Sequence, residues 1–127
     1  MKKILVIEDE IDIRDILNKI LSFEGFNVVE ADDGISGLNT ARRELPDLII
    51  CDVMMPGLDG FQLAAELKKE DVTAVIPFIF LSARADRSDV RRGMELGADD
   101  YLTKPFTKTA LLKAINTRIE KNNTNKK

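Results

Sequence analysis

Short apolar runs alternate with amphipathic helical patterns five times along this chain, and this alternation constrains the fold more than any other feature. Each run has the length of a buried strand and is followed by residues with the spacing of a helix that has one apolar face. Five such units in 127 residues predict one domain with a parallel sheet and helices on both faces. The expected fold class is therefore α/β, a doubly wound (βα)5 three-layer sandwich.

The expected strands cover residues 3–7, 27–31, 48–51, 75–81 and 100–103. The expected helices cover residues 12–23, 33–43, 59–69, 86–96 and 107–121, and Asp33 and Asp59 are placed to cap two of them. The first and third strands are the most apolar, which puts them at the centre of the sheet, and the second strand is expected at an edge. The first helix is expected to turn inward Ile13, Ile16, Leu17, Ile20 and Leu21. We expect the domain to span residues 1–121, followed by a flexible polar tail or the start of a linker at 122–127.

Histidine is absent, and Cys51 is the single cysteine. These counts exclude His-based catalytic triads, a phosphohistidine on this chain and a Cys-rich zinc site. Any metal must therefore be held by oxygen atoms, which favours Mg²⁺, Mn²⁺ or Ca²⁺. Cys51 lies within an apolar run and is expected to be a small buried residue.

The net charge is −3, and no basic face indicates direct binding to nucleic acid. No apolar stretch has the length needed to span a bilayer, and the chain opens on a strand without a visible signal peptide. A single cysteine fits a reducing compartment. We therefore expect a cytoplasmic protein that binds neither nucleic acid nor membrane directly.

Polar residues stand where four of the apolar runs end. Glu8 and Asp9 follow the first run, Asp52 the third, Ser82 the fourth and Lys104 the fifth. The carboxyl ends of parallel strands share one edge of a sheet, and open α/β sheets build their sites there. An acidic cluster, a hydroxyl and a lysine at one edge suit a divalent cation and a phosphoryl group.

Position alone leaves several roles open within this set. Asp52 is suited to be a metal ligand, a nucleophile or a general base. Asp9 is favoured as a direct metal ligand, with Glu8 direct or acting through water, because adjacent residues on a strand point to opposite sides. Ser82 is as well placed to cap the helix expected from residue 86 as to donate to a ligand.

Lys104 is either an ordinary surface lysine or a cation directed into the site. Pro105 follows it, and the bond between the two residues is a candidate for the cis isomer. With Asp52 as nucleophile, and with a cation, Ser82 and Lys104 stabilising the transferred group, the set is able to form an acyl phosphate.

The chain resembles the receiver domain of two-component response regulators, the CheY-like family, from Lys2 to about Glu120. The resemblance rests on four segments that occur in order. They are Ile4-Leu5-Val6-Ile7-Glu8-Asp9-Glu10; Pro46-Asp47-Leu48-Ile49-Ile50-Cys51-Asp52-Val53-Met54-Met55-Pro56-Gly57-Leu58-Asp59-Gly60; Leu81-Ser82-Ala83-Arg84; and Gly97-Ala98-Asp99-Asp100-Tyr101-Leu102-Thr103-Lys104-Pro105-Phe106. One of these segments alone would be weak support, whereas four in the right order are specific.

The resemblance implies a strand order of 2-1-3-4-5 and a role for each matched residue. Asp52 corresponds to the phosphoacceptor. The implied Mg²⁺ site, with Mn²⁺ as the alternative metal, comprises Glu8, Asp9, Asp52 and the backbone carbonyl of Met54. The implied phosphoryl-binding and switch residues are Ser82, Ala83, Lys104 and Tyr101, of which Tyr101 matches an aromatic position that turns inward on activation.

The resemblance also implies partners and a mode of action. The phosphoryl group would come from a sensor histidine kinase or a histidine phosphotransfer protein, and the switched surface would span the last two helices and the last strand. Such a protein catalyses only its own phosphorylation and slow dephosphorylation, and acts on a downstream effector domain or protein. A phosphorylation-dependent homodimer is a further expectation, although Ala110 and Ala114 replace the acid and arginine that pair across the dimer in one transcription-factor subgroup.

Three other functions compete with this interpretation. A haloacid dehalogenase-like phosphatase needs an acid two residues after its nucleophile, where this chain has Met54. A flavodoxin-type carrier is disfavoured by the acidic residues 8–10, where a flavin phosphate would lie. A pseudo-receiver that only binds partners would not need the complete set of acids, serine and lysine. The chain is expected to be either a single-domain regulator or a receiver from a longer protein.

Overall fold

A computed structural model describes residues 2–84 and 86–125 of the chain, with side chains as far as Glu120. Within these residues, five parallel strands form one sheet in the order β2-β1-β3-β4-β5. The strands are β1 (Lys3–Ile7), β2 (Asn27–Ala31), β3 (Leu48–Asp52), β4 (Phe78–Ser82) and β5 (Asp100–Thr103). The α/β class, the strand order and the edge position of the second strand are confirmed.

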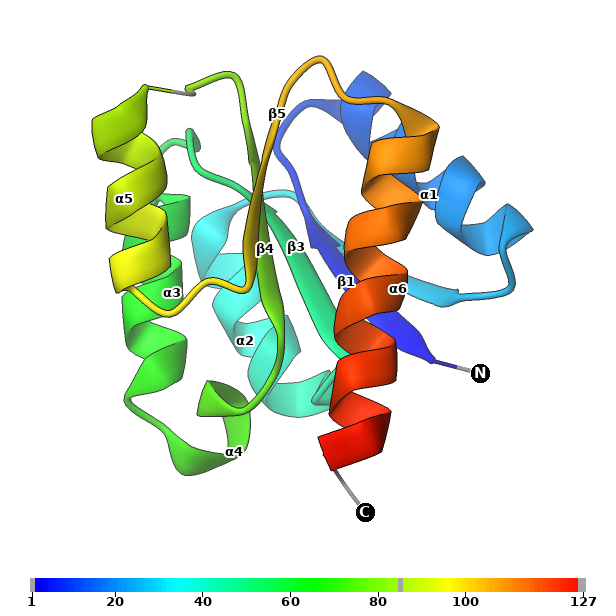
Figure 1. The fold of residues 1–127 in the computed structure, drawn as a ribbon. Helices are drawn as coiled ribbons and strands as arrows, with labels where there is room; N and C mark the ends of the chain where they lie inside the picture. Colours follow the sequence, from blue (N-terminus) through cyan, green and yellow to red (C-terminus); the bar gives the residue numbers. More distant parts are fainter. Residues whose placement is uncertain (1, 85, 126–127) are drawn as a thin grey trace.

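Helices cover both faces of the sheet. On one face lie α1 (Ile11–Phe23) and α6 (Lys108–Asn125), and on the other lie α2 (Gly34–Glu44), α3 (Gly60–Lys68) and α5 (Arg87–Glu95) (Figure 1). Alternate residues of each strand serve opposite faces, so Val6 packs into the core with Leu17 while Ile7 packs into the core with Phe61. Full burial of each such side chain contributes about 1.5–3 kcal/mol, which makes these two layers the main source of stability.

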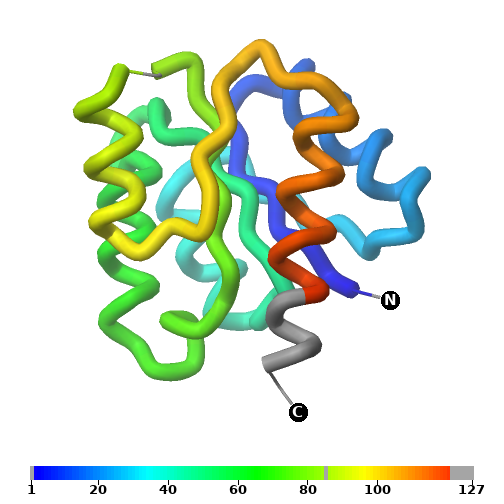
Figure 2. Tube along the Cα trace, viewed as in Figure 1, coloured from blue at the N-terminus to red at the C-terminus, as the bar shows by residue number. Residues whose placement is uncertain are grey.

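The winding of the chain creates a position for a site. Figure 2 shows the trace leaving β1 toward the β2 edge and then returning past β1 to build β3, β4 and β5 in the other direction. The reversal falls between β1 and β3, the two strands at which ligands bind in open sheets of this order. The loops that follow β4 and β5 lie at the top of Figure 1, at the carboxyl edge of the sheet.

The two helix caps expected from the sequence are confirmed. The Asp33 carboxylate accepts the backbone N–H of Ser36 at 2.7 Å. Asp59 accepts the backbone N–H of Gln62 at 2.8 Å, and the Gln62 side chain accepts the Asp59 backbone N–H at 2.9 Å. This reciprocal pair satisfies two donors that the helix itself leaves without partners, so α3 begins at a defined point directly after the β3 loop.

The expected strand over residues 75–81 is wrong at both ends. A single helical turn, α4 (Asp71–Ala74), precedes it, and β4 begins only at Phe78 and includes Ser82. The Thr73 hydroxyl donates to the Leu67 carbonyl at 2.6 Å, which folds this turn back onto the end of α3. Val75 is left 75% exposed, so its apolar character does not mark a buried strand.

Two expectations about helices also need correction. Ile16 is 47% exposed, whereas Leu17 and Leu21 are buried. Ile16 lies one residue before Leu17, about 100° around the helix, which places it beyond the inward face. The last helix continues four residues past its expected end at Lys121, to Asn125. The expected tail at 122–127 therefore overlaps this helix, and residues 126–127 lie outside the described part of the chain.

Two aspartates connect strands at the amino edge of the sheet. The Asp47 carboxylate accepts the backbone N–H of Lys3 at 2.7 Å, and the Asp99 carboxylate accepts the backbone N–H of Phe78 at 2.8 Å. Each aspartate directly precedes one strand and bonds to the first residue of the strand paired with it. Both carboxylates therefore use backbone donors to hold the starts of strands in place.

Candidate functional site

The polar residues predicted at the strand ends converge at the carboxyl edge of the sheet. Glu8 and Asp9 follow β1, Asp52 ends β3, Ser82 ends β4 and Lys104 follows β5. Because β1 and β3 are direct neighbours, the acidic residues gather where the winding direction reverses. The sequence therefore located this group of side chains correctly.

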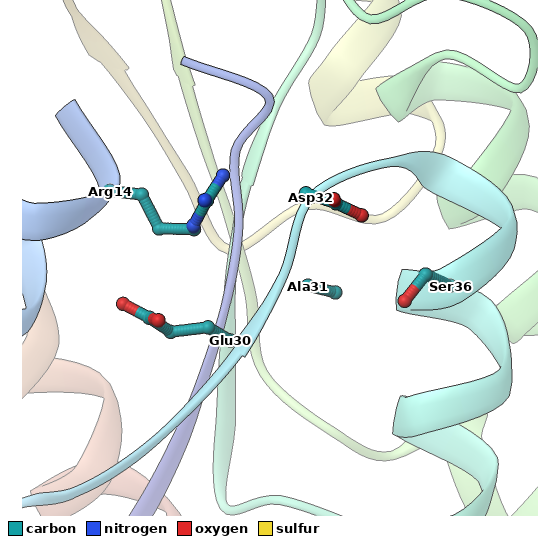
Figure 3. A pocket seen from close by; sticks show the side chains of 5 residues that line it. All are labelled: Arg14, Glu30, Ala31, Asp32 and Ser36. Carbon is teal, nitrogen blue, oxygen red and sulfur yellow. The ribbon is translucent and has the colours of Figure 1, made fainter. Parts of the chain in front are cut away.

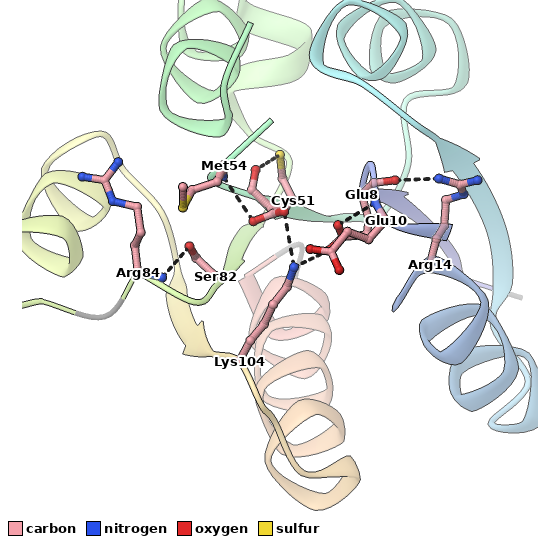
Figure 4. A network of polar contacts seen from close by, with 9 residues as sticks. Glu8, Glu10, Arg14, Cys51, Met54, Ser82, Arg84 and Lys104 are labelled. Atoms are coloured by element: carbon pink, nitrogen blue, oxygen red, sulfur yellow. Dashed lines mark hydrogen bonds and ion pairs between the residues drawn. The ribbon is translucent and has the colours of Figure 1, made fainter. Parts of the chain in front are cut away.

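The ammonium group of Lys104 lies between two carboxylates (Figure 4). Its Nζ is 2.7 Å from Oε1 of Glu8 and 3.3 Å from Oδ2 of Asp52. Burial disfavours the charge on this ammonium, but the Glu8 and Asp52 carboxylates outweigh that effect and raise the pKa of Lys104. Lys104 is thus a permanent cation directed into the site, and its bond to Pro105 is cis.

Glu8 is buried with few donors around it. Its Oε2 accepts the backbone N–H of Glu10 at 3.1 Å, while Oε1 accepts no hydrogen bond of standard geometry within the described residues and lies 2.7 Å from the Lys104 ammonium. Burial raises the pKa of Glu8 to about 7, against the opposing effects of Lys104 and the Glu10 N–H. A buried carboxylate oxygen with so few donors is suited to bind a cation.

Asp52 has a backbone donor and close backbone packing beside it. The backbone N–H of Met54 donates to Asp52 Oδ1 at 3.2 Å, and Gly60 packs so closely on the Asp52 carbonyl that no larger residue fits there. Burial raises the pKa of Asp52, and the charge of Lys104 opposes that rise. Cys51 is fully buried directly behind Asp52, as the sequence indicated.

Three carboxylates form one cluster. Glu8, Asp9 and Asp52 each offer an oxygen, and these oxygens lie within 4.8 Å of one another. Glu8 and Asp9 both reach the cluster although they are adjacent, because β1 ends at Ile7 and the strand alternation stops there. Asp9 is exposed while the other two are buried, so a cation would have access from solvent. An all-oxygen set of this charge, with one oxygen short of donors, fits a hard divalent cation.

Ser82 lies on the other side of the carboxyl edge from Glu8. Its side chain is fully buried, and its Oγ accepts the backbone N–H of Arg84 at 3.0 Å. The alternative role as a helix cap is not observed, because the residue at the start of α5 is Asp86, which itself makes no cap hydrogen bond through its side chain. Ala83, between Ser82 and Arg84, is exposed.

Tyr101 is half-buried next to this segment. Its hydroxyl donates to the backbone carbonyl of Arg84 at 2.5 Å, and its ring lies 5.8 Å from that of Phe80. Burial raises the pKa of the Tyr101 hydroxyl, which therefore remains a donor at neutral pH.

Arg14 is a site residue that the sequence did not reveal. Its Nη1 donates to the backbone carbonyl of Glu8 at 2.8 Å and so holds the start of the acidic loop (Figure 4). The same side chain lines a pocket of about 300 Å³ beside the end of β2, together with Glu30, Asp32 and Ser36 (Figure 3). A cation near the start of a helix is opposed by the helix dipole, and this unfavourable placement is a signal that could have pointed to Arg14.

A second hollow of about 380 Å³ lies beside the loop that follows β3. It is lined by Val53, Met54, Met55, Pro56, Asp59 and Arg84. The Met54 side chain is 54% exposed at its rim, and this thioether is neither an acid nor a base. The residue two positions after Asp52 therefore offers no proton donor or acceptor with acid–base function.

Comparison with known proteins assigns this site to a family. The family model described as "Response regulator receiver domain" matches residues 4–116, and the chain belongs to that family of CheY-like domains in two-component systems. Receiver domains are signalling modules that interact with histidine kinases, and they are not conventional enzymes. The acidic cluster of Glu8, Asp9 and Asp52 is typical of the magnesium and phosphoacceptor site of such domains.

Two relatives among curated proteins are transcriptional regulators by name. The Phosphate regulon transcriptional regulatory protein PhoB of Escherichia coli is 45% identical over 121 residues, which cover 93% of this chain and 53% of that protein. The Transcriptional regulatory protein CseB of Streptomyces coelicolor is 45% identical over 112 residues, or 88% of this chain and 47% of that protein. The chain thus spans about half the length of the curated relatives it matches.

Solved structures support the same assignment. A response regulator receiver domain protein from Clostridium thermocellum superposes with a TM-score of 0.90 at 32% identity, over 98% of both chains. A CheY-like receiver domain protein from Methanospirillum hungatei gives a TM-score of 0.92 at 26% identity, again over 98% of both chains. In the described part of the chain, no helix combines the length and the apolar character needed to cross a membrane.

Proposed function

We propose that this receiver takes a phosphoryl group onto Asp52 from a phosphohistidine of a sensor kinase or a histidine phosphotransfer protein. The observation that carries the proposal is the position of the Lys104 ammonium, 3.3 Å from Asp52 and 2.7 Å from Glu8. An Asp52 oxygen forms the new P–O bond as the P–N bond of the donor breaks. The electron pair of the P–N bond stays on the imidazole nitrogen. Lys104 is placed to balance the charge of the transferred group.

Mg²⁺ is part of the proposal, with Mn²⁺ as the alternative. The carboxylates of Glu8, Asp9 and Asp52 would hold it, with the Met54 carbonyl as a further ligand. When bound, the cation neutralises charge on the phosphoryl oxygens. Glu8 Oε1 accepts no hydrogen bond within the described residues, and the three carboxylates repel one another. Both features favour a cation at this place.

The proposed output is a change in the surface formed by α5, β5 and α6. Ser82 is expected to donate to a phosphoryl oxygen, with Ala83 contributing its backbone N–H, and Tyr101 to respond to the movement of Ser82. Ala110 is exposed and Ala114 is buried, and neither is able to form a salt bridge across a dimer. The proposed target of this surface is therefore an effector domain or protein, and size measurement with and without BeF₃⁻ tests for a homodimer. Action in the cytoplasm is also proposed, because response regulators usually work there.

Incubation with acetyl phosphate and Mg²⁺ tests the phosphoacceptor. Asp52→Asn should abolish incorporation of phosphate, whereas Asp47→Asn, a matched change directly before the start of the same strand, should leave it intact. Labelling that survives in Asp52→Asn would overturn the assignment. If the unsubstituted protein takes up no phosphate and binds no Mg²⁺, a pseudo-receiver replaces the proposal.

A further inference from the structure

Arg84 makes three contacts, and each reaches a different part of the molecule. Its backbone N–H donates to the Ser82 hydroxyl oxygen at 3.0 Å, and its backbone carbonyl accepts the Tyr101 hydroxyl. Its guanidinium Nη2 lies 2.8 Å from Oδ1 of Asp89 in α5. One residue therefore joins Ser82, at the end of β4, to Tyr101 in β5 and to Asp89 in α5.

Asp89 is an unusual partner for this arginine. Its side chain is 7% exposed, and Arg84 is the one ion-pair partner it has within the described residues. One turn further along α5, Gly93 packs against the rings of Phe80 and Tyr101, so the same helix face is closely packed. A buried carboxylate costs free energy unless it is paired, and its place in the first turn of α5 adds favourable interaction with the helix dipole.

The two members of the pair differ in their exposure to solvent. The Arg84 side chain is 48% exposed, and Figure 4 shows it directed away from Lys104. Asp89 is fixed within the packed face of α5, and its charge holds the guanidinium in place. The position of the Arg84 backbone is therefore set by α5 on one side and by Ser82 and Tyr101 on the other.

We propose that the Arg84–Asp89 ion pair makes Arg84 a positioning residue that couples Ser82 and Tyr101 to α5. This inference rests on the proposed function of Asp52 and states how its phosphorylation is transmitted. When Ser82 turns to donate to a phosphoryl oxygen, its oxygen remains bonded to the Arg84 N–H and draws that backbone with it. The ion pair passes the displacement to α5, and the hydrogen bond at the Arg84 carbonyl passes it to Tyr101.

The composition of the chain provides a direct reporter. Tyr101 is the single tyrosine and there is no tryptophan, so intrinsic fluorescence excited at the tyrosine band reports on Tyr101 alone. The experiment compares emission and acrylamide quenching with and without BeF₃⁻ and Mg²⁺ in the full chain. Asp89→Asn removes the charge with little change of shape. Asp86→Asn is the matched control, because Asp86 is exposed and makes no cap hydrogen bond through its side chain.

In the unsubstituted protein and in Asp86→Asn, BeF₃⁻ is expected to change the Tyr101 signal to the same degree. In Asp89→Asn, bound BeF₃⁻ measured by fluorine NMR is expected to be retained, while the Tyr101 response falls by about twofold or more. A purely structural role would lower thermal stability and leave the response per bound BeF₃⁻ unchanged, and that result would overturn the inference. An equal loss in Asp86→Asn would also overturn it, because the effect would then be one of general charge.

A second variant guards against misfolding. Arg84→Met combined with Asp89→Leu removes both charges together and leaves no unpaired carboxylate in the interior. It is expected to lose the Tyr101 response while still binding BeF₃⁻, and a full response in this variant contradicts the inference. Failure of the unsubstituted protein to bind BeF₃⁻ would contradict the proposed function of Asp52, which is a different outcome from binding without coupling.

Discussion

Carboxylates stand at both edges of the sheet, but their surroundings differ. At the amino edge, Asp47 and Asp99 each accept a backbone N–H from another strand, at 2.7 and 2.8 Å. At the carboxyl edge, Glu8 and Asp52 are buried and share one ammonium group, Lys104. Burial raises the pKa of both Glu8 and Asp52, whereas the donors at the amino edge hold strands together. The difference teaches that a site forms where buried acids outnumber the donors around them.

The largest expected effect comes from removing the shared cation. Lys104→Met leaves Glu8 and Asp52 buried without a counter-charge, and should lower the free energy of unfolding by about 3 kcal/mol at pH 8 without metal. Added Mg²⁺ should restore part of the loss. Urea denaturation with and without Mg²⁺ measures both effects. Lys113→Met, on the exposed face of α6, is the control, and equal losses in the two variants would contradict the special environment of Lys104.

The next effect is a dependence on pH. The pKa of Glu8 is raised from 4.5 to about 7, so the folded state binds a proton that the unfolded state releases in this range. The contribution of Glu8 to the stability of the metal-free protein should therefore be greatest below pH 4.5 and fall as pH rises toward 7. Mg²⁺ affinity should change in the opposite sense, weakening by up to about tenfold per pH unit below 7 as protons compete.

Calorimetric titration of Mg²⁺ at several pH values, with thermal unfolding in parallel, measures this linkage. Glu8→Gln is the control variant, since it has no proton to release. The stability of the unsubstituted protein is compared with that of Glu8→Gln at each pH. If the difference rose in favour of the unsubstituted protein between pH 4.5 and 7, the assignment to Glu8 would be contradicted.

A smaller effect is expected at the amino edge. Asp99→Ala removes the acceptor of the Phe78 backbone N–H and should cost about 1–2 kcal/mol of stability. Mg²⁺ affinity and phosphate labelling should be unchanged, because Asp99 lies at the opposite edge from Asp52. Asp15→Ala, an exposed acid on α1, is the comparison for thermal unfolding. A loss of Mg²⁺ affinity in Asp99→Ala would show that the two edges are not independent.

The smallest effect is expected for Glu70, an acid that belongs to neither of the two groups of carboxylates compared above. Glu70 forms a 2.8 Å ion pair with Arg42, and both side chains are about 40% exposed. Glu70→Gln should change the free energy of unfolding by less than about 0.5 kcal/mol, and less still at high salt. Urea denaturation at two ionic strengths measures this, and a loss as large as that of Asp99→Ala would show that exposure does not weaken the pair.

The sequence predicted the fold well because its local patterns agree with the tertiary packing. Apolar runs identified the strands, apart from the bounds of β4, and Asp33 and Asp59 identified two helix starts through the chemistry of their side chains. Placement of polar residues at strand ends was enough to bring Glu8 and Lys104 together, although they belong to opposite ends of the chain.

The parts that were not predicted depend on contacts between segments. The α4 turn is stabilised by the Thr73 hydroxyl on the Leu67 carbonyl, a bond that no periodicity reveals. Arg14 and Arg84 act through contacts that exist only in the folded chain. The Arg14 side chain donates to the backbone carbonyl of Glu8, and the Arg84 backbone N–H donates to the Ser82 hydroxyl oxygen. Asp89 could have been noticed, because it lies four residues before Gly93 on the inward face of a helix, where a lone acid is out of place.

Lys104 and Asp52 are 52 positions apart in the chain, yet they meet in one ion pair. Their contact requires β3, β4 and β5 to be paired in order, and the contact with Glu8 requires β1 as well. A chain emerging from the ribosome therefore cannot assemble this pocket until β5 has been made. The proposed ability to accept phosphate should thus arise only after Lys104 has been made, so that copies without a paired β5 do not take up the phosphoryl group.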